Sequence, residues 1–279
     1  MTTTAHSNAR PGDYVDAGGL RTYFEAYGDG EPLLLLPGGL CTAETFDGQS
    51  APLGERHRVY VVERRGQGRT PDVDGPITYE NMADDTIAFL EAMEIGSAHL
   101  VGWSDGALVG LHVALRRPEL VRKLVLIGQY VNLQGARPEQ YLFLERVTRD
   151  AFPPSFEQAY AAVSPDGPEH FGVVFEKLLP LWRSDPSFTP TDLEHVAAPP
   201  LVLMGDDDVL SLEHAAMLQQ AVPDCMIAVV PGTSHALPLE KPELVSRLVL
   251  DFLADEQRPK LLGTDTLRAL VAAAESERT

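Results

Sequence analysis

The chain has 279 residues, of which 44% are hydrophobic, and carries a formal net charge of −19. This size and apolar content suit one large domain with a substantial core. The negative charge argues against nucleic acid or an anionic membrane as a partner, because both bind basic surfaces. The two cysteines, Cys41 and Cys225, are too few for a disulfide framework, and their spacing matches no metal site.

The first 13 residues are polar and lack the apolar stretch of a signal peptide. The longest apolar runs contain a handful of residues, which is too short to span a bilayer. We therefore expect a cytoplasmic protein that acts on a small molecule as a monomer or homodimer.

Short apolar runs recur along the chain and predict strands. Residues 14–15 and 20–27 show partial alternation, which favours an antiparallel edge. The later runs are continuously apolar, as in parallel strands covered on both faces, and comprise residues 33–36, 59–62, 98–101, 124–127, 201–204 and 226–230. Amphipathic stretches at 79–93 and 240–253 predict helices between or after them. The pattern indicates an α/β fold with a mostly parallel central sheet and flanking helices.

The alternation of predicted strands and helices stops between residues 130 and 195. The segment is rich in Pro, Phe and Tyr, and it has helical spacing at 138–149 and 168–182. A stretch of this length with its own helices is an inserted helical subdomain rather than a loop. We therefore expect a core formed by residues 1–129 and 196–279, with 130–195 inserted.

The last segment, residues 264–277, predicts one more helix. Its apolar residues, among them Leu267, Leu270 and Val271, fall on one face. We expect this face to pack on the domain or on another copy of the chain.

The sequence Gly-Trp-Ser-Asp-Gly at 102–106 follows the predicted strand 98–101 and precedes a helical stretch at 107–116. Glycine and serine are common in turns, so the pattern alone is a weak signal. Its position at a strand-to-helix turn is that of a nucleophile elbow, which makes Ser104 the candidate nucleophile. The amides at the start of the helix favour developing negative charge there.

A serine nucleophile needs a base, and the base needs a carboxylate. His235 lies just past the strand predicted at 226–230, where the carboxyl edge of a parallel sheet gathers active groups. The strand predicted at 201–204 is followed by Asp206, Asp207 and Asp208. The order Ser, Asp, His fits a hydrolase, but local reasoning leaves the choice among the three aspartates open.

An oxyanion hole requires two backbone N–H groups. One belongs to Asp105, directly after the nucleophile. The other is expected in Pro-Gly-Gly-Leu at 37–40, where Gly38 and Gly39 allow close approach of a ligand; a plain glycine turn is the alternative. Arg64 and Gln67 follow the strand at 59–62. We expect them in a solvent-exposed loop; a position at the border of the pocket is the alternative.

Together, LLLLPGG, VERRGQGRT, GWSDG, GDDD and PGTSH resemble the motifs of the α/β-hydrolase superfamily over residues 14–253. The resemblance implies the α/β-hydrolase fold, a catalytic acid at Asp208, and oxyanion N–H groups at Gly39 and Asp105. It also implies that the insertion is a lid, and that neither a metal nor an organic cofactor is needed.

Within the superfamily, the chain resembles the valacyclovir hydrolase (biphenyl hydrolase-like) family, which shares L-P-G and G-W-S-D-G. Most relatives have His where this chain has Pro37, a change that leaves the backbone N–H groups in place. The resemblance implies that the Asp105 carboxylate binds an ammonium group of an amino-acid ester. The alternative is that this carboxylate braces the elbow through a local hydrogen bond.

The leading hypothesis is a serine hydrolase that cleaves a small carboxylic ester through an acyl-enzyme. Aromatic residues of the lid are candidates to line an apolar pocket, with others expected in the lid core: Tyr141, Phe143, Phe152, Phe171, Phe175 and Trp182. Phe143 and Trp182 are the candidate substrate contacts. A carbon–carbon bond hydrolase or a lactonase on the same triad is the enzymatic alternative. A ligand-binding protein on a hydrolase scaffold is the alternative of another class.

Overall fold

The computed structural model describes residues 12–254 and 261–276. The expectation about a signal peptide concerns residues that lie almost entirely outside this part. Within it, eight strands form one sheet in the order β1-β2-β4-β3-β5-β6-β7-β8. The strands are β1 (Asp13–Ala17), β2 (Leu20–Tyr27), β3 (Glu31–Leu36), β4 (His57–Val62), β5 (Ala98–Trp103), β6 (Val121–Ile127), β7 (Pro200–Asp207) and β8 (Met226–Ser234).

The sheet is antiparallel at one edge and parallel elsewhere. Strand β2 pairs antiparallel with both β1 and β4, which confirms the predicted antiparallel edge. From β4 to β8 every neighbouring pair is parallel. The carboxyl ends of β3, β5, β7 and β8 therefore meet at one edge of the sheet, where the candidate site residues follow them.

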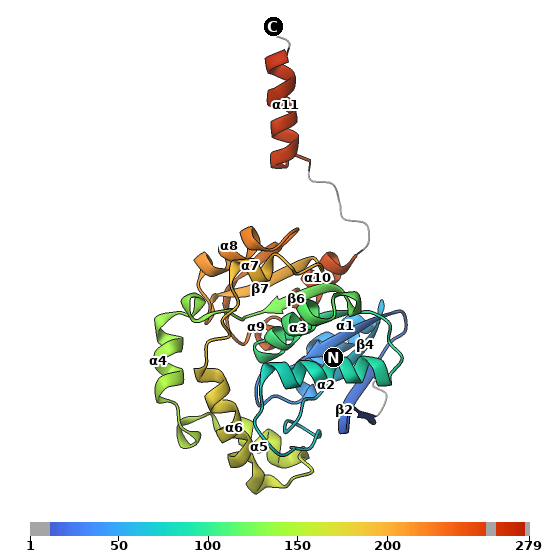
Figure 1. Cartoon of the computed structure of the whole chain (residues 1–279), viewed down its shortest axis with the longest axis vertical. Coiled ribbons are helices and arrows are strands. Elements are labelled where there is room, and N and C mark those ends of the chain that lie inside the picture. Colours follow the sequence, from blue (N-terminus) through green and yellow to red (C-terminus); the bar gives the residue numbers. More distant parts are fainter. Residues whose placement is uncertain (1–11, 255–260, 277–279) are drawn as a thin grey trace, which may run out of the picture.

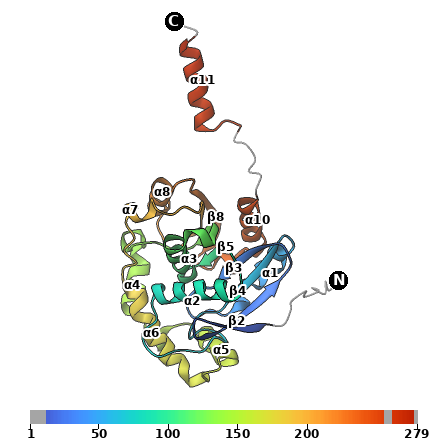
Figure 2. The ribbon, with the colours of Figure 1, turned by 45° about the vertical axis from the view of Figure 1, so that its right-hand side comes forward.

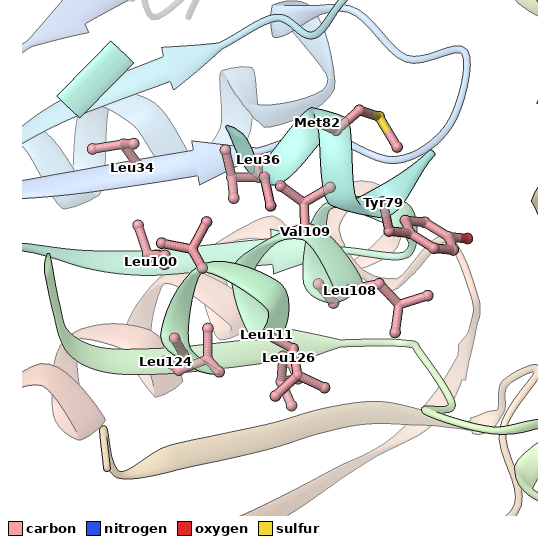
Figure 3. Close-up of a cluster of buried hydrophobic side chains, with 14 of the residues drawn as sticks. Leu34, Leu36, Tyr79, Met82, Leu100, Leu108, Val109, Leu111, Leu124 and Leu126 are labelled. Carbon is pink, nitrogen blue, oxygen red and sulfur yellow. The ribbon is translucent and has the colours of Figure 1, made fainter. Parts of the chain in front are cut away.

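Helices cover both faces of the sheet (Figure 1). The first hydrophobic cluster, on one face, includes residues of α1 (Asp47–Gly54), α9 (Leu237–Glu240) and α10 (Pro242–Leu253). The second cluster, on the other face, includes residues of α2 (Tyr79–Ala92), α3 (Asp105–Arg116) and α8 (Leu212–Ala221). Successive residues of β3 alternate between these clusters: Leu33 and Leu35 join the first, Leu34 and Leu36 the second. Figure 3 shows the second cluster, where α3 lies over Leu36, Leu100 and Leu124. Burial on both faces is why the predicted strands read as unbroken apolar runs.

The segment 130–195 contains helices α4 (Pro138–Arg146), α5 (Pro154–Val163), α6 (Phe171–Arg183) and α7 (Pro190–Leu193). Helices α4 and α6 match the predicted stretches to within a few residues, whereas α5 and the short α7 were not predicted. Helices α4 to α6 lie together beside the sheet (Figure 2). Lys177 of α6 donates a 2.6 Å hydrogen bond to Asp72 Oδ2, which ties this helical segment to the loop after β4.

Helix α11 (Thr264–Ser276) occurs where a helix was predicted, and residue 277 lies outside the described part. It stands away from the rest of the molecule in both views (Figures 1 and 2). Its apolar residues Leu267, Leu270 and Val271 are exposed, so the expectation that this face packs on the domain is wrong for the described residues. Packing on another copy stays a prediction. Within the described ranges, no helix has the length and apolar character needed to cross a membrane.

Candidate active site

The turn between β5 and α3 holds Ser104 in an unusual backbone conformation, with φ 54° and ψ −123°. L-residues rarely adopt it, and such strain clusters at functional sites. A Cβ on Gly102 would lie 2.2 Å from the carbonyl oxygen of Gly106, and one on Gly106 would lie 2.0 Å from that of Leu36. The two glycines of the motif are therefore required by close backbone approach, and Ser104 is left at the tip of the turn.

His235 begins the turn that follows β8 and lies between the serine and an aspartate. Its Nε2 is 3.1 Å from Ser104 Oγ, and its Nδ1 is 2.9 Å from Asp208 Oδ1. The indole N–H of Trp103 donates a 2.8 Å hydrogen bond to the His235 carbonyl. Because Trp103 directly precedes Ser104, this bond ties the histidine turn to the elbow.

The structure separates the three adjacent aspartates. The Asp208 side chain is fully buried, and besides His235 it accepts hydrogen bonds from the N–H groups of Gly205 and Val209. Asp207 belongs to β7, and its side chain is 89% exposed. Of the three, Asp208 is the one that contacts the histidine, which is the choice that family spacing implied and local reasoning left open.

A cavity of about 160 Å³ opens in front of the serine, and Gly39, Asp105 and His235 line it together with Ser104. Gly39 lies in the loop after β3, and Asp105 is the first residue of α3. The two residues expected to supply oxyanion N–H groups thus border the same space as the serine hydroxyl.

The Asp105 side chain is 3% exposed, and both of its oxygens accept hydrogen bonds. Tyr79 Oη donates to Oδ1 at 2.9 Å, and Trp182 Nε1 donates to Oδ2 at 2.8 Å. Both partners are distant in sequence, so the carboxylate joins α2 and α6 to the elbow rather than bracing it locally. Burial and, next, the charge of Asp105 raise the pKa of Tyr79 well above its usual range and that of Tyr130 to about 12.

The cavity wall is largely aromatic, and both predicted substrate contacts, Phe143 and Trp182, belong to it. Of the other lid aromatics expected there, Phe152 lines the cavity, whereas Tyr141, Phe171 and Phe175 do not. Sequence reasoning missed further lining residues, which include Tyr79, Gln129, Tyr130, Gln140 and Phe156. Phe152 stacks on Trp182 with ring centroids 5.9 Å apart. Among the described lining residues, Asp105 is the one carboxylate and no Lys or Arg occurs.

The expectation that Arg64 and Gln67 lie in a solvent-exposed loop is wrong. Arg64 is 4% exposed and Gln67 is 1% exposed, because the loop after β4 turns inward beneath the loop at 37–41. Polar residue types in a glycine-rich stretch favour a surface loop. The signal that could have located them is their position directly after a buried parallel strand at the active edge of the sheet.

The model of the α/β hydrolase family matches residues 33–248, which is most of the chain. The chain belongs to the α/β hydrolase family. As a member of it, the chain is a hydrolase, and its fold is the one that the motifs implied.

Individual relatives cover nearly the whole domain. The mouse protein named serine hydrolase BPHL is 30% identical over 86% of this chain and 85% of its own length. A protein of Azorhizobium caulinodans named "Putative carbamate hydrolase RutD" is 25% identical over 87% of this chain and 98% of its own length. The crystal structure of a serine hydrolase involved in carbazole degradation superposes with a TM-score of 0.72, at 25% identity, over 87% of this chain and 98% of that one.

Proposed function

We propose that this α/β hydrolase is a serine hydrolase that cleaves a carboxylic ester of a small molecule through an acyl-enzyme. The observation that carries the proposal is the unbroken line of contacts from Ser104 Oγ to His235 Nε2 and from His235 Nδ1 to Asp208 Oδ1. That line is the arrangement in which an imidazole removes a proton from a serine hydroxyl and a buried carboxylate stabilises the imidazolium.

In the proposed reaction, Ser104 Oγ attacks the ester carbonyl while its proton passes to His235 Nε2. The N–H groups of Gly39 and Asp105 stabilise the negative charge that develops on the carbonyl oxygen. The tetrahedral intermediate then breaks its bond to the alcohol oxygen, which leaves with the proton from His235. Water, deprotonated by His235, attacks the acyl-enzyme in the same way, releases the acid and restores the serine.

We assign the helical segment 130–195 as a lid on a core made of residues 1–129 and 196–279. This lid supplies much of the aromatic wall, including Phe143, Phe152 and Trp182. An aromatic wall favours an apolar, preferably aryl, group on the acyl or alcohol side of the substrate.

The charge of the cavity restricts the substrate further. Asp105 is the one carboxylate on the described walls, whereas the buried Arg64 that offsets part of its charge lies behind Gly38 and does not line the cavity. The carboxylate on the wall therefore disfavours a negatively charged substrate. Two like charges ~6 Å apart at an effective dielectric constant of ~20 repel by about 3 kcal/mol. A carboxylate accepts about four hydrogen bonds, so Asp105 retains acceptor sites beyond those used by Tyr79 and Trp182. An ammonium group, as in an amino-acid ester, fits this charge.

The charge of the cavity also ranks the alternative functions. Carbon–carbon bond cleavage in a dienoic acid places a substrate carboxylate in a cavity with no cationic partner on its described walls, so we rank it below ester hydrolysis. A lactone is an uncharged cyclic ester and is compatible with the cavity. A pure binding protein does not require a serine, a histidine and an aspartate in hydrogen-bonding sequence.

The test compares three p-nitrophenyl substrates on the wild type and on Ser104→Ala. Valerate and hydrogen glutarate esters have similar length and differ by one carboxylate, and a phenylalanine ester adds an ammonium group. We expect the valerate to be cleaved with a kcat/KM at least about 10-fold above that of the glutarate, because a repulsion of 1.4 kcal/mol already gives that ratio. Ser104→Ala should lose esterase activity and labelling by a fluorophosphonate.

Asp105→Asn separates the two roles of the aspartate. If it lowers kcat/KM for the phenylalanine ester alone, Asp105 binds the ammonium group. If it lowers kcat/KM equally for all three substrates, the Asp105 side chain is structural. Full esterase activity in Ser104→Ala would overturn the proposed mechanism. Labelling of Ser104 without turnover of any ester would favour the binding protein.

A further inference from the structure

The loop that carries Gly39 rests on a buried guanidinium group. Arg64 Nη2 donates a 2.6 Å hydrogen bond to the carbonyl oxygen of Gly38 and a 3.2 Å hydrogen bond to Gln67 Oε1. The same Oε1 accepts a 2.8 Å hydrogen bond from the N–H of Leu40. The pair Arg64 and Gln67 therefore holds one carbonyl and one N–H on either side of Gly39.

The bond to Gly38 fixes the direction of the neighbouring N–H. The carbonyl of Gly38 and the N–H of Gly39 belong to one peptide group, and the described chain contains no cis peptide. In a planar trans peptide the C=O and N–H point in opposite directions. Gly38 and Gly39 line the cavity and Arg64 does not. With its carbonyl bound to Arg64, this peptide directs the Gly39 N–H towards the cavity.

The charge of Arg64 acts in the same direction. An arginine remains protonated in proteins, and a hydrogen bond from a charged donor polarises the peptide that accepts it. Arg64 Nη1 is buried and has no hydrogen-bond partner among the described residues. Burying a guanidinium with an unsatisfied amino group is unfavourable for stability alone. The arrangement therefore suits a role in the site better than a role in the core.

We propose that Arg64 is a positioning residue for the oxyanion hole: it orients and polarises the peptide between Gly38 and Gly39, with Gln67 holding Arg64 and Leu40 in register. The inference rests on the proposed serine hydrolase mechanism. Arg64 does not contact the substrate; it acts through the Gly39 N–H. The Gly38 carbonyl also accepts a 3.2 Å hydrogen bond from the Cys41 N–H. Without Arg64, that weaker hydrogen bond alone holds the carbonyl, so the Gly39 N–H is less firmly oriented and the peptide is less polarised.

The experiment uses the full chain and the variants Arg64→Met and Gln67→Met. Arg64→Lys, which keeps the charge, tests rescue, and Arg65→Met is the matched control. Arg65 is the next residue and forms a partly buried ion pair with Asp85. Each variant is tested for kcat and KM on p-nitrophenyl valerate, and for inhibition by a trifluoromethyl ketone and by the matching secondary alcohol. The ketone forms a hemiketal oxyanion with Ser104, whereas the alcohol does not.

For Arg64→Met we expect kcat to fall about 10- to 100-fold with KM nearly unchanged, since loss of one oxyanion donor costs about 100- to 1,000-fold. Ketone affinity should fall by a similar factor and alcohol affinity should not. Gln67→Met should show the same pattern more weakly, and Arg64→Lys should recover part of the loss. Arg65→Met should leave the affinity for both inhibitors unchanged.

Equal ketone affinity in the wild type and in the folded Arg64 and Gln67 variants would overturn the inference. A parallel loss of ketone and alcohol affinity would also overturn it, because it would indicate general disruption of the cavity. Should Arg64→Met fail to fold, the same comparison of ketone affinity with alcohol affinity is made on Arg64→Lys and Gln67→Met. If the wild type neither reacts with a fluorophosphonate nor binds the ketone, the proposed mechanism itself fails.

Discussion

Replacing Gly39 by alanine tests how closely the loop after β3, the elbow at Ser104 and helix α6 of the proposed lid are packed. A Cβ at this position would lie 2.4 Å from Asp105 Oδ2, 2.7 Å from Trp182 Cζ2 and 3.1 Å from Trp182 Nε1. The added methyl group therefore enters the hydrogen bond between the indole and the carboxylate. Either helix α6 or the Asp105 side chain must move.

The cost follows from these contacts. Loss of a hydrogen bond to a charged group costs about 1.5–3 kcal/mol, and overpacking a tight site costs about 1–3 kcal/mol. We therefore expect the Gly39→Ala variant to lose roughly 2.5–6 kcal/mol of unfolding free energy, a large part of the ~5–15 kcal/mol typical of a domain. Gly96→Ala is the matched control, because a Cβ there has no neighbour within 4 Å. It should be neutral or stabilising by up to about 1 kcal/mol.

The assay is denaturant unfolding of both alanine variants, followed by a double-mutant cycle with Trp182→Ala. Removing the indole makes room for the methyl group. The double variant should therefore lose at least about 1 kcal/mol less unfolding free energy than the sum of the losses in the two single variants. Equal stability of the Gly39→Ala and Gly96→Ala variants would refute the packing argument. Strict additivity with Trp182→Ala would show that the methyl group is accommodated elsewhere.

Further predictions concern the acid, the pH dependence and the C-terminal helix. Asp208→Asn should lower kcat by roughly 1,000- to 10,000-fold, because an amide cannot accept from both Gly205 N–H and His235 Nδ1–H; the exposed neighbour Asp207→Asn should retain wild-type kcat, and equal effects would contradict the assignment. Burial lowers the pKa of His214 from 6.5 to about 4, and its neutral Nε2 accepts the Val131 N–H. The folded state then binds fewer protons than the unfolded chain, so stability should be complete above pH ~6.5 and fall by up to about 3 kcal/mol as the pH drops to ~4. Urea unfolding across this range should show a shallower dependence for His214→Gln, and an unchanged dependence would exclude this histidine as a cause. A variant that ends at residue 254 should have an unfolding free energy within about 0.5 kcal/mol of that of the full chain, since the apolar residues of α11 are exposed. A larger loss of stability would show that α11 has a partner. So would a lower molar mass per particle than that of the full chain, beyond the mass removed, measured by size-exclusion chromatography with light scattering.

The fold was predictable because its signals are local and redundant. The strand 33–36 reads as four leucines since neighbouring side chains enter opposite hydrophobic clusters, and the other parallel strands repeat this pattern. Helix α5 was missed because the expected stretches on either side, 138–149 and 168–182, carried the clearer apolar spacing. The exposure of α11 was not predictable, because an apolar face indicates that a helix can pack and does not name the partner.

The candidate site was partly predictable for the same reason. Chain order and strand ends brought Ser104 and His235 together, whereas the choice of Asp208 over Asp207 required either family spacing or the structure. The contacts of Asp105 with Tyr79 and Trp182 span 26 and 77 residues and leave no local trace in the sequence. Arg64 and Gln67 were misplaced because a polar glycine-rich stretch has the same composition whether it faces water or packs beneath another loop, as here beneath the loop at 37–41.

The double attachment of Asp105 has a consequence for redesign and for evolution. Its backbone belongs to the first turn of α3, beside Ser104, while its carboxylate accepts a hydrogen bond from the indole of Trp182 in helix α6 of the proposed lid. If the proposed lid is exchanged for that of a relative, the new segment either supplies a hydrogen-bond donor to the Asp105 carboxylate or leaves that carboxylate without one of its present donors. Specificity and turnover are coupled at this point: a lid that admits a new substrate but discards Trp182 leaves a buried carboxylate with one donor fewer. Successful lid exchanges should carry a replacement donor or a compensating change at residue 105.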